Sequence, residues 1–498
     1  MRLSDVADMA AGSFGERVAF ACGPESISYE QLAAAARTAA MELREQRYQT
    51  LAYLGQSSVA FPLAMFSAAY AGMPLIPLNY RLSDEQLRQQ LQLLEAPLLL
   101  VDPEYTHVLE GLQVPHQLTH DWSSAARTSP PRALDVTIDD DAQPALILFT
   151  SGTGGTPKQA VLRHSHLTSY VVQSIEFGNA HPDEATLTSV PPYHIAGAGA
   201  VISNTFAGRR VVYLPNFSAE EWLDTVRSER VTSAMVVPTM LARIVEALGD
   251  RPAETPTLRH VAYGGARMPR PVIEAALERF PDVEFVNAYG LTETSSTIAL
   301  LDGAAHRKAM ASDDPEVRDR LASVGRPLPG VEIQIRDGSG APVATGETGK
   351  LHVRGPQVSG EYRGIGSAVD EQGWFATGDV ARFDADGFLF VEGRSDDIII
   401  RGGENISPDV IEDVLLRHTS VRDVAVVGVP DPEWGQEIVA VVVPEDGASV
   451  EEQTLRDWVR AALRGSLTPK EIHFTPELPY TPTGKLKRAQ VLEELDPA

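Results

Sequence analysis

The chain has 498 residues, more than a single hydrophobic core usually serves, so we expect two or more domains. A formal net charge of −26 argues against nucleic acid or an anionic membrane surface as a partner. The single cysteine, Cys22, excludes internal disulfides and a cysteine-rich metal site, and the N-terminus lacks the layout of a signal peptide. Together these features predict a cytoplasmic protein.

The first hundred residues predict strands that alternate with helices, which indicates a parallel sheet with crossover helices. Ser28 with Gln31 forms a capping-box pattern before an Ala-rich helix that should reach about Arg44. The uncharged stretch 59–78 is interrupted by Pro and Gly, so it predicts a buried helix, a turn and a short strand, and no membrane span. Further predicted elements are strands at 51–54 and 98–102 and a helix that begins after Ser83 and ends near Leu94.

Residues 103–143 are rich in Asp, Ser, Pro and His, and we expect them to form a surface connection. An apolar strand over 145–149 follows. It leads into a segment of small and hydroxyl residues that ends in Pro-Lys, namely Thr150, Ser151, Gly152, Thr153, Gly154, Gly155, Thr156 and Lys158. Backbone N–H groups, hydroxyls and a lysine suit a polyphosphate. The common nucleotide loop has Gly-Lys-Ser/Thr instead. A flexible linker is the alternative, but linkers seldom follow a buried strand directly.

Three more buried strands, over 232–239, 258–266 and 283–294, each end in Gly, Thr or Glu. Ligands of open α/β sheets bind beyond the carboxyl ends of the strands. Gly264, Gly265, Ala266 and the turn 289–293 should therefore line one crevice. Glu293 offers the oxygen ligand that Mg²⁺ prefers, and Tyr289 offers a flat surface for adenine.

Further turn and helix signals precede a change of character in the last hundred or so residues. Asp384 to Gly387 resembles a Ca²⁺ loop but lacks its closing Glu, so a hairpin turn is favoured. Ser407 and Pro408 predict the cap and first turn of a helix. β runs over 424–430 and 438–444 and an amphipathic helix over 451–464 then predict a compact α+β unit.

The motifs and their order resemble the adenylate-forming superfamily, which includes acyl-CoA synthetases, peptide-synthetase adenylation domains and luciferases. The matching segments are 150–158, 190–199, Tyr-Gly-Leu-Thr-Glu at 289–293, 373–388, 391–408 and Thr-Gly-Lys at 483–485. Gly154, usually Thr in the family, and Gln159, often Gly or Ala, depart from the family pattern. The resemblance implies an α/β fold with a large N-terminal domain of parallel sheets, residues 1–394. A small mobile α+β lid, residues 395–498, would pivot near Asp396.

The resemblance also assigns roles. Lys485 is the adenylation lysine, Thr292 contacts the nucleotide phosphate, Glu293 coordinates Mg²⁺, and His194 shifts between half-reactions. ATP contacts, besides the phosphate loop with Gly265 and Ala266, are Asn287, Ala288, Tyr289, Gly290, Asp379 and Arg394. The acyl pocket takes His194, Val237, Thr239, Gly264, Ala266 and Ala288. The acceptor tunnel takes Gly402, Gly403, Glu404 and Trp434, of which Trp434 should be half-exposed.

The implied activity is ATP-dependent activation of a carboxylic acid to an acyl-adenylate, with release of pyrophosphate and transfer to coenzyme A. An amide ligase, in which an amine attacks the adenylate, is the alternative, because Leu467 replaces a basic residue often found in CoA ligases. Adenylation for a separate carrier protein and a non-catalytic nucleotide-binding regulator are further options. The sequence does not identify the acid or the oligomeric state, although many relatives are dimers.

Overall fold

The computed structural model describes residues 1–130, 140–150, 157–401, 404–448, 450–463, 465–480 and 486–495, without the side chains of Glu404 and Asn405. Several expected site residues lie outside the described residues: Ser151, Gly152, Thr153, Gly154, Gly155, Thr156, Gly402, Gly403 and Lys485.

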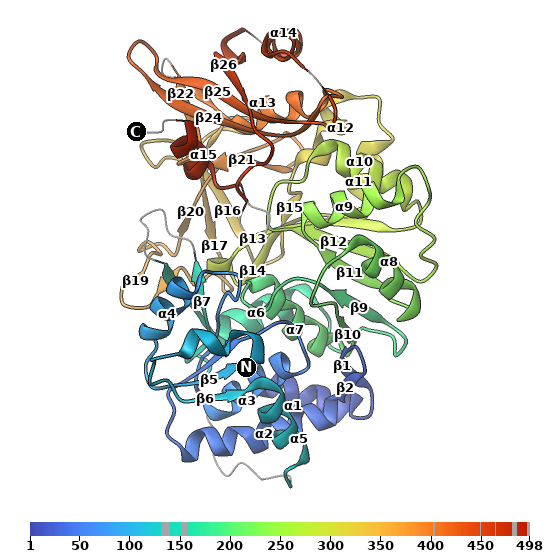
Figure 1. Cartoon of the computed structure of the whole chain (residues 1–498), viewed down its shortest axis with the longest axis vertical. Helices are drawn as coiled ribbons and strands as arrows, with labels where there is room; N and C mark the ends of the chain where they lie inside the picture. The colour runs from blue at the N-terminus through green and yellow to red at the C-terminus, as the bar shows by residue number, and fades with distance from the viewer. Residues whose placement is uncertain are drawn as a thin grey trace.

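Two large mixed sheets form the body of the molecule (Figure 1). The first sheet has parallel strands in its centre and antiparallel strands at both edges. Its strands, in spatial order, are β15 (Arg326–Pro327), β14 (Ser296–Leu301), β13 (Glu284–Leu291), β12 (His260–Gly264), β11 (Ser233–Val236), β9 (Ala185–Thr188), β10 (Arg210–Tyr213), β1 (Val18–Cys22) and β2 (Glu25–Ser28).

The second sheet is parallel from β7 to the edge strand β6 and antiparallel at the other edge, so the prediction of parallel sheets is correct for part of each sheet. Its spatial order is β19 (Gly366–Ser367), β18 (Glu361–Tyr362), β8 (Lys158–Arg163), β7 (Pro144–Thr150), β4 (Leu75–Pro77), β3 (Thr50–Leu54), β5 (Pro97–Val101) and β6 (His116–Leu118).

Helices that share one hydrophobic core with a face of each sheet include α1 (Leu3–Phe14), α2 (Tyr29–Glu45), α3 (Ala60–Ala71), α6 (His164–Ser174) and α7 (Ile195–Ala207). Every residue of α3 is buried, which confirms the prediction of a buried helix within 59–78. The capping box at Ser28 and Gln31 is also confirmed. None of the helices that the structure describes combines the length and apolar character that a membrane crossing needs.

The outer faces of the two sheets are covered separately. α8 (Ala219–Ser228), α9 (Pro238–Leu248), α10 (Arg270–Arg279) and α11 (Gly303–Met310) contribute to the core on the first sheet, and α12 (Pro315–Asp319) follows α11. α4 (Asp84–Gln92) and the 3-10 helix η1 (Pro103–Leu109) cover the second sheet.

The expectation of a plain surface connection over 103–143 is wrong for its first part. This part contains η1, β6 and helix α5 (Thr119–Thr128), and Trp122 of α5 is only 4% exposed. The polar composition conceals this order because α5 buries a single narrow face, made of Thr119, Trp122, Ser123 and Ala126.

A small antiparallel sheet continues from the body toward the C-terminal lobe. Its strands are β16 (Glu332–Arg336), β17 (Gly349–Arg354), β20 (Phe375–Phe383) and β21 (Leu389–Arg394). The turn between β20 and β21 is a hairpin in which Asp384 N donates to Phe388 O at 2.9 Å, so the prediction for 384–387 is confirmed.

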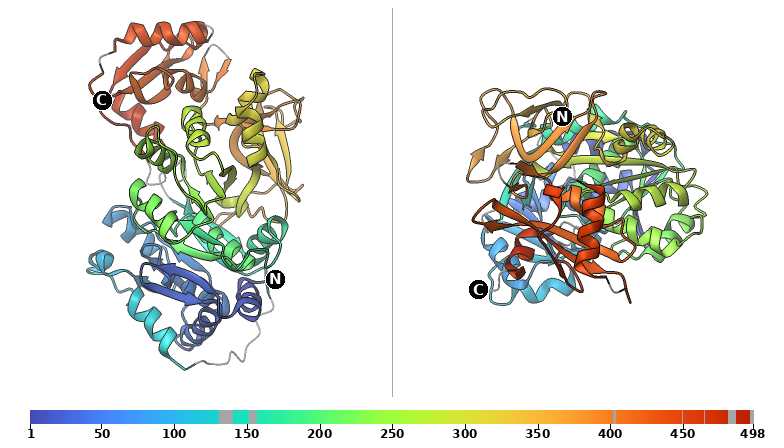
Figure 2. Two further views of the ribbon diagram at one scale, coloured as in Figure 1. Left: turned by 90° about the vertical axis from the view of Figure 1, so that its right-hand side faces the viewer. Right: turned by 90° about the horizontal axis from the view of Figure 1, so that it is seen from above.

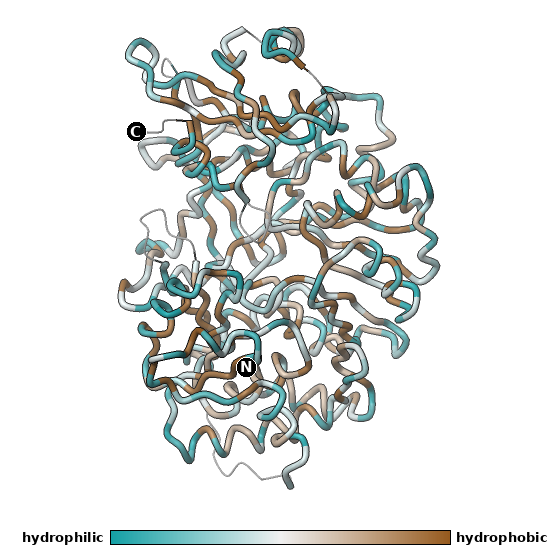
Figure 3. The backbone as a smooth tube through the Cα atoms, in the orientation of Figure 1, coloured by the Kyte–Doolittle hydropathy of each residue, from teal (hydrophilic) through white to brown (hydrophobic). Residues whose placement is uncertain are grey.

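The C-terminal residues form a separate lobe at one end of the molecule (Figure 2). Its sheet and helices comprise β22 (Ile399–Arg401), β23 (Glu404–Ile406), β24 (Val421–Asp431), β25 (Gly435–Pro444), β26 (Glu471–Phe474), α13 (Pro408–Leu415), α14 (Glu452–Ala462) and α15 (Arg488–Leu495). Figure 3 shows apolar residues along the strands of this lobe, and buried clusters pack on both faces of its sheet. The predicted α+β unit is therefore confirmed.

Within the described part of the chain, side chains at two places join this lobe to the body. Arg267, just after β12, pairs with Asp413 and with Asp409, 3.3 Å away, on α13. Ser407 stands at the N-cap position of α13, as predicted, but its hydroxyl donates to Glu392 O of β21 and makes no side-chain cap. The contact with β21 replaces the usual capping bond.

Candidate active site

The carboxyl ends of β11, β12 and β13 meet closely, as expected for a binding crevice. Gly264 and Ala288 are register partners, and a Cβ on Gly264 would lie 2.3 Å from Ala288 O. Gly265 has φ +85°, and the position that its Cβ would take lies 3.9 Å from Val237 Cγ1. Only glycine fits the close backbone approach at position 264, and the positive φ favours glycine at position 265. The structure thus brings together the predicted crevice and pocket residues Val237, Gly264, Gly265 and Ala288.

A polar cluster lies where β13 meets the small sheet. Tyr289 donates a hydrogen bond to Asp379, and Arg394 Nη1 donates to Asp379 Oδ1 at 3.0 Å. Asp379 and Arg394 face each other across β20 and β21. The carboxylate is only 8% exposed, whereas the guanidinium side chain is 47% exposed. Burial and the nearby Asp379 charge raise the pKa of Tyr289, so its hydroxyl stays a donor at neutral pH.

Glu293 lies in a tight turn, the 3-10 helix η2 (Thr292–Thr294), and is 9% exposed. Tyr362 Oη donates to Glu293 Oε1 at 2.8 Å. The two residues after η2, Ser295 and Ser296, have φ of +55° and +115°, a backbone region that costs free energy for side-chain-bearing residues. Strain of this kind is concentrated at ligand-binding and catalytic sites.

Lys158, at the exposed start of β8, lies beside the same tyrosine. Its Nζ is 5.3 Å from the centre of the Tyr362 ring. Thr150 and Lys158 are register partners on β7 and β8, so the predicted phosphate loop joins two antiparallel strands. Burial and the charge of Glu293 raise the pKa of Tyr362, which therefore remains protonated between the lysine and the carboxylate.

The donor set at Glu293 fits Mg²⁺. No cluster of three or more His, Cys, Asp or Glu side chains that could hold a metal occurs among the described residues. Mg²⁺ commonly binds through one or two carboxylates together with substrate phosphates and water. A lone buried carboxylate beside a predicted phosphate loop matches this pattern, whereas it would not suffice for a metal held by protein ligands alone.

His194 stands directly before α7, and its ring centre is 4.3 Å from that of Tyr193. A Cβ on Gly199 of α7 would lie 3.7 Å from Ser296 Oγ. The start of α7 therefore approaches the turn that carries Glu293. Thr239, in contrast, is exposed on the first turn of α9.

Two residues that were expected to contact ATP take part in contacts that stabilise the fold. The Asn287 side chain donates to Ser323 O at 3.1 Å, and a Cβ on Gly290 would lie 1.8 Å from Ser296 O. Asp396, the expected pivot, is exposed just beyond β21.

On the C-terminal lobe, Trp434 is 43% exposed, as expected, and the guanidinium of Arg401 lies 5.0 Å from its ring centre. Arg401 also pairs with Glu437 at 2.9 Å. Nearby, Lys470 pairs with Asp431 at 3.2 Å. Among the described residues of this region, Arg401 and Lys470 thus each pair with an acidic side chain.

Sequence reasoning did not find Tyr362. It is 69 residues from Glu293 and belongs to no motif with a chemical pattern. Arg267, which contacts the C-terminal lobe, was also missed, although it directly follows the Gly264-Gly265-Ala266 segment.

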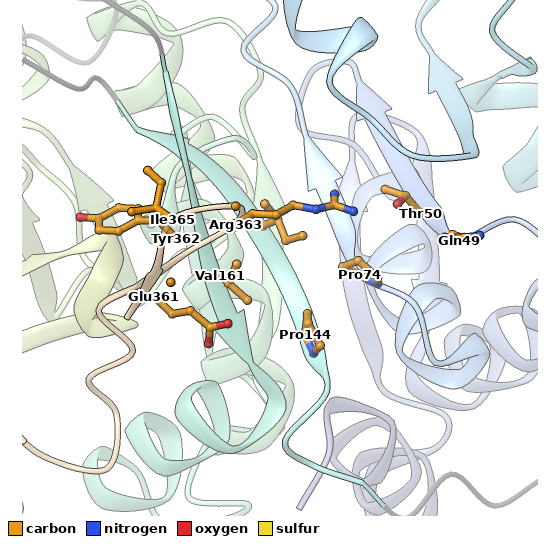
Figure 4. Close-up of a pocket in the computed structure, with 12 residues that line it drawn as sticks. Gln49, Thr50, Pro74, Pro144, Val161, Glu361, Tyr362, Arg363 and Ile365 are labelled. Atoms are coloured by element: carbon orange, nitrogen blue, oxygen red, sulfur yellow. The ribbon is translucent and has the colours of Figure 1, made fainter. Parts of the chain in front are cut away.

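A cavity of about 610 Å³ lies on the other side of Tyr362, which is one of its lining residues (Figure 4). Thr50 and Pro144, which line it, begin β3 and β7, and Pro74 directly precedes β4. The cavity is therefore at the amino-terminal edge of the second sheet. Because ligands of such sheets bind at the opposite edge, it is not the candidate active site.

The fold and the site define a family. A family model described as AMP-binding enzyme matches residues 7–363, and one described as AMP-binding enzyme C-terminal domain matches residues 410–485. The chain belongs to this family, part of the adenylate-forming superfamily, and is a ligase of the acyl-CoA synthetase type.

Individual proteins refine the comparison. A feruloyl-CoA synthase of Amycolatopsis is 35% identical over 447 residues, which cover 89% of this chain and 88% of that protein. The o-succinylbenzoate CoA synthetase of Bacillus subtilis, solved with its acyl-adenylate, has a TM-score of 0.85 at 27% identity and covers 98% of this chain and 97% of its own. An amide bond synthetase from Marinactinospora thermotolerans has a TM-score of 0.86 at 28% identity over 100% of both chains.

Proposed function

We propose that this enzyme activates an aromatic carboxylic acid with ATP and transfers the acyl group to coenzyme A. The observation that carries the proposal is the convergence of Tyr289, Asp379 and Arg394 beside the glycine-lined ends of β12 and β13. The aromatic class is supported by the feruloyl and o-succinylbenzoate names of the relatives and by the small residues of the pocket, Gly264 and Ala288.

In the first step, a carboxylate oxygen of the acid attacks the α-phosphorus of ATP. The bond from that phosphorus to the bridging oxygen breaks, and pyrophosphate leaves with the electron pair. Positioning and charge neutralisation supply most of the catalysis. Asp379 accepts from the ribose hydroxyls, Lys158 binds the leaving phosphates, and Lys485 bridges carboxylate and phosphate oxygens. Glu293 would hold Mg²⁺, which when bound would supply neutralisation of the phosphate charge.

In the second step, the thiol sulfur of coenzyme A attacks the acyl carbon. The bond from that carbon to the AMP oxygen breaks, AMP leaves, and the thiol proton passes to water. We assign the acceptor passage to Trp434 and the segment 402–404. We also propose that the lid, residues 395–498, pivots at Asp396 between the steps. The position of Asp396 between the last strand of the small sheet and the first strand of the lobe supports this pivot.

The second candidate is an amide ligase. It is favoured by the pairing of Arg401 with Glu437 and of Lys470 with Asp431, which lowers the positive charge available to coenzyme A phosphates. Leu467 adds no charge in the same region. The similarity to an amide bond synthetase supports this candidate as well.

The test incubates enzyme, ATP and Mg²⁺ with a panel of aromatic and aliphatic acids, with coenzyme A, with mixed amines, or with neither. Mass spectrometry identifies the products. Acyl-CoA from aromatic acids supports the proposal, and amide formation that is indifferent to coenzyme A favours the second candidate. Failure to consume ATP with every acid would overturn both.

Matched tryptophan variants sharpen the test. Trp434→Ala should raise the KM for coenzyme A while acid-dependent pyrophosphate exchange stays unchanged. Trp458→Ala serves as the control, because Trp458 belongs to the same lobe and is 42% exposed, close to the 43% of Trp434. An equal effect of both variants on coenzyme A would remove Trp434 from the acceptor passage.

A further inference from the structure

The short strand β18 places Tyr362 beside the two charged residues of the candidate phosphate site, Lys158 and Glu293. Tyr362 and Ala160 are register partners on β18 and β8, which brings the Tyr362 ring to Lys158 near the start of β8. In Figure 4, the Tyr362 ring points away from the cavity at the sheet edge, whereas the neighbouring Arg363 points toward it. Tyr362 is among the residues that line the cavity, and its hydrogen bond to Glu293 together with the approach of its ring to Lys158 also places it at the candidate active site.

Among the described residues, the Tyr362 hydroxyl donates to the Oε1 atom of Glu293 at 2.8 Å. A hydrogen bond to a carboxylate oxygen fixes the rotation of the carboxylate. It thereby determines which lone pairs are available to a cation. Partners of this kind orient metal ligands, and their loss commonly lowers metal affinity or activity by 10- to 100-fold.

The chain just before Tyr362 holds the same turn through its backbone. Ser359 N and Gly360 N donate to Glu293 O at 2.8 and 3.2 Å. Gln357 is fully buried, and its amide donates to Thr294 O at 3.0 Å and to Thr297 O at 2.8 Å. These bonds flank the two strained serines that follow η2, so the segment 357–362 holds the turn in its strained conformation.

We propose that Tyr362 is a positioning residue for the nucleotide-bound cation. Its hydroxyl orients Glu293, and its ring supports the ammonium group of Lys158 by a cation–π contact. One side chain thus couples the carboxylate expected to hold Mg²⁺ to the lysine expected to hold phosphate. This inference rests on the proposed function, because it takes Glu293 and Lys158 as parts of an ATP site.

The experiment compares ATP binding by calorimetry at increasing Mg²⁺ for wild type, Tyr362→Phe and Tyr362→Leu. Tyr362→Phe keeps the ring and loses the hydroxyl. The Mg²⁺ concentration that gives half of the maximal increase in ATP affinity should therefore rise about tenfold. Its ATP affinity without Mg²⁺ should not change. Tyr362→Leu removes the ring too, so it should also weaken ATP binding without Mg²⁺.

Tyr29→Phe is the control for loss of a buried phenol. Tyr29 is 2% exposed, and its hydroxyl donates to Arg209 O at 2.8 Å, among helices of the core. This variant should lower the melting temperature and leave the Mg²⁺ titration unchanged.

Two failures can be told apart. If wild type binds ATP with Mg²⁺ enhancement and Tyr362→Phe follows the same curve, the positioning role is wrong and the proposed function stands. If wild type shows no Mg²⁺-enhanced ATP binding, the proposed function fails and the positioning role fails with it. Pyrophosphate exchange gives a second readout, in which Tyr362→Phe should shift the Mg²⁺ requirement without changing the KM of the acid.

Discussion

Asp379 offers the most direct test of the nucleotide site. Its side chain is 8% exposed and is held by Tyr289 and Arg394. Asp379→Asn removes the charge that would accept the ribose hydroxyls. Hydrogen bonds to charged groups contribute about 1.5–3 kcal/mol, and about 1.4 kcal/mol corresponds to a tenfold change in affinity. ATP affinity should therefore fall by about 10- to 150-fold.

The stability of the variant should fall as well. Asp379 is buried and accepts from Tyr289 and Arg394, so weakening these hydrogen bonds should cost about 1–3 kcal/mol. Calorimetry of ATP binding and a thermal melt measure the two effects separately. The KM of the acid should remain near that of wild type, because Asp379 contacts only the nucleotide in the proposed site.

The same hairpin supplies a matched control. Asp384 is 17% exposed and pairs with Arg320 at 2.9 Å, but it lies at the turn between β20 and β21, at the other end of the strands from Asp379. Asp384→Asn should leave ATP affinity unchanged. The reasoning is refuted if Asp379→Asn binds ATP within about twofold of wild type, or if Asp384→Asn loses as much affinity.

Three further predictions concern other parts of the chain. Burial lowers the pKa of His164 to about 3, so protonation favours the unfolded chain below pH 6.5. Urea titrations should therefore show a loss of about 2 kcal/mol in the free energy of unfolding by pH 5. The His164→Asn variant should lack this part of the loss. Gly264→Ala should cost about 1–3 kcal/mol and impair ATP binding, whereas Gly12→Ala, with open space around its Cβ, should do neither. Lys485→Ala should abolish pyrophosphate exchange at an unchanged melting temperature, with exposed Lys487 as the control; normal exchange would reject the assignment.

Local patterns predicted much of the fold. The capping box at Ser28 and the hairpin at 384–387 depend on residues a few positions apart, so the sequence contains the whole interaction. The crevice at Gly264 was predictable for a different reason. The carboxyl ends of parallel strands lie at the same edge of a sheet. The position of the crevice can therefore be predicted from the order of strands and helices, without knowing which side chains touch.

Contacts between distant segments could not be predicted in this way. Tyr362 forms a hydrogen bond with Glu293, which is 69 residues away, and the sequence around Tyr362 contains no motif that indicates a binding-site residue. Ser407 fits the pattern of a capping residue, yet a carbonyl of β21 takes its hydroxyl. Helix α5 buries only a narrow face, so its polar composition does not indicate a helix that packs on the core. In each case tertiary packing outweighed the local signal.

The pairing of β20 with β21 continues almost to the proposed pivot. Arg394, bound to Asp379, ends β21, and Ser395 N still donates to Gly378 O at 2.8 Å. Nucleotide bound at Asp379 should therefore alter the free energy of rotation at Asp396. Thermodynamic reciprocity then requires the orientation of the lid to change nucleotide affinity by the same factor. AMP affinity and lid orientation would in that case be two readings of one equilibrium, so a variant that shifts the lid toward one orientation should shift the affinity for AMP by the same factor.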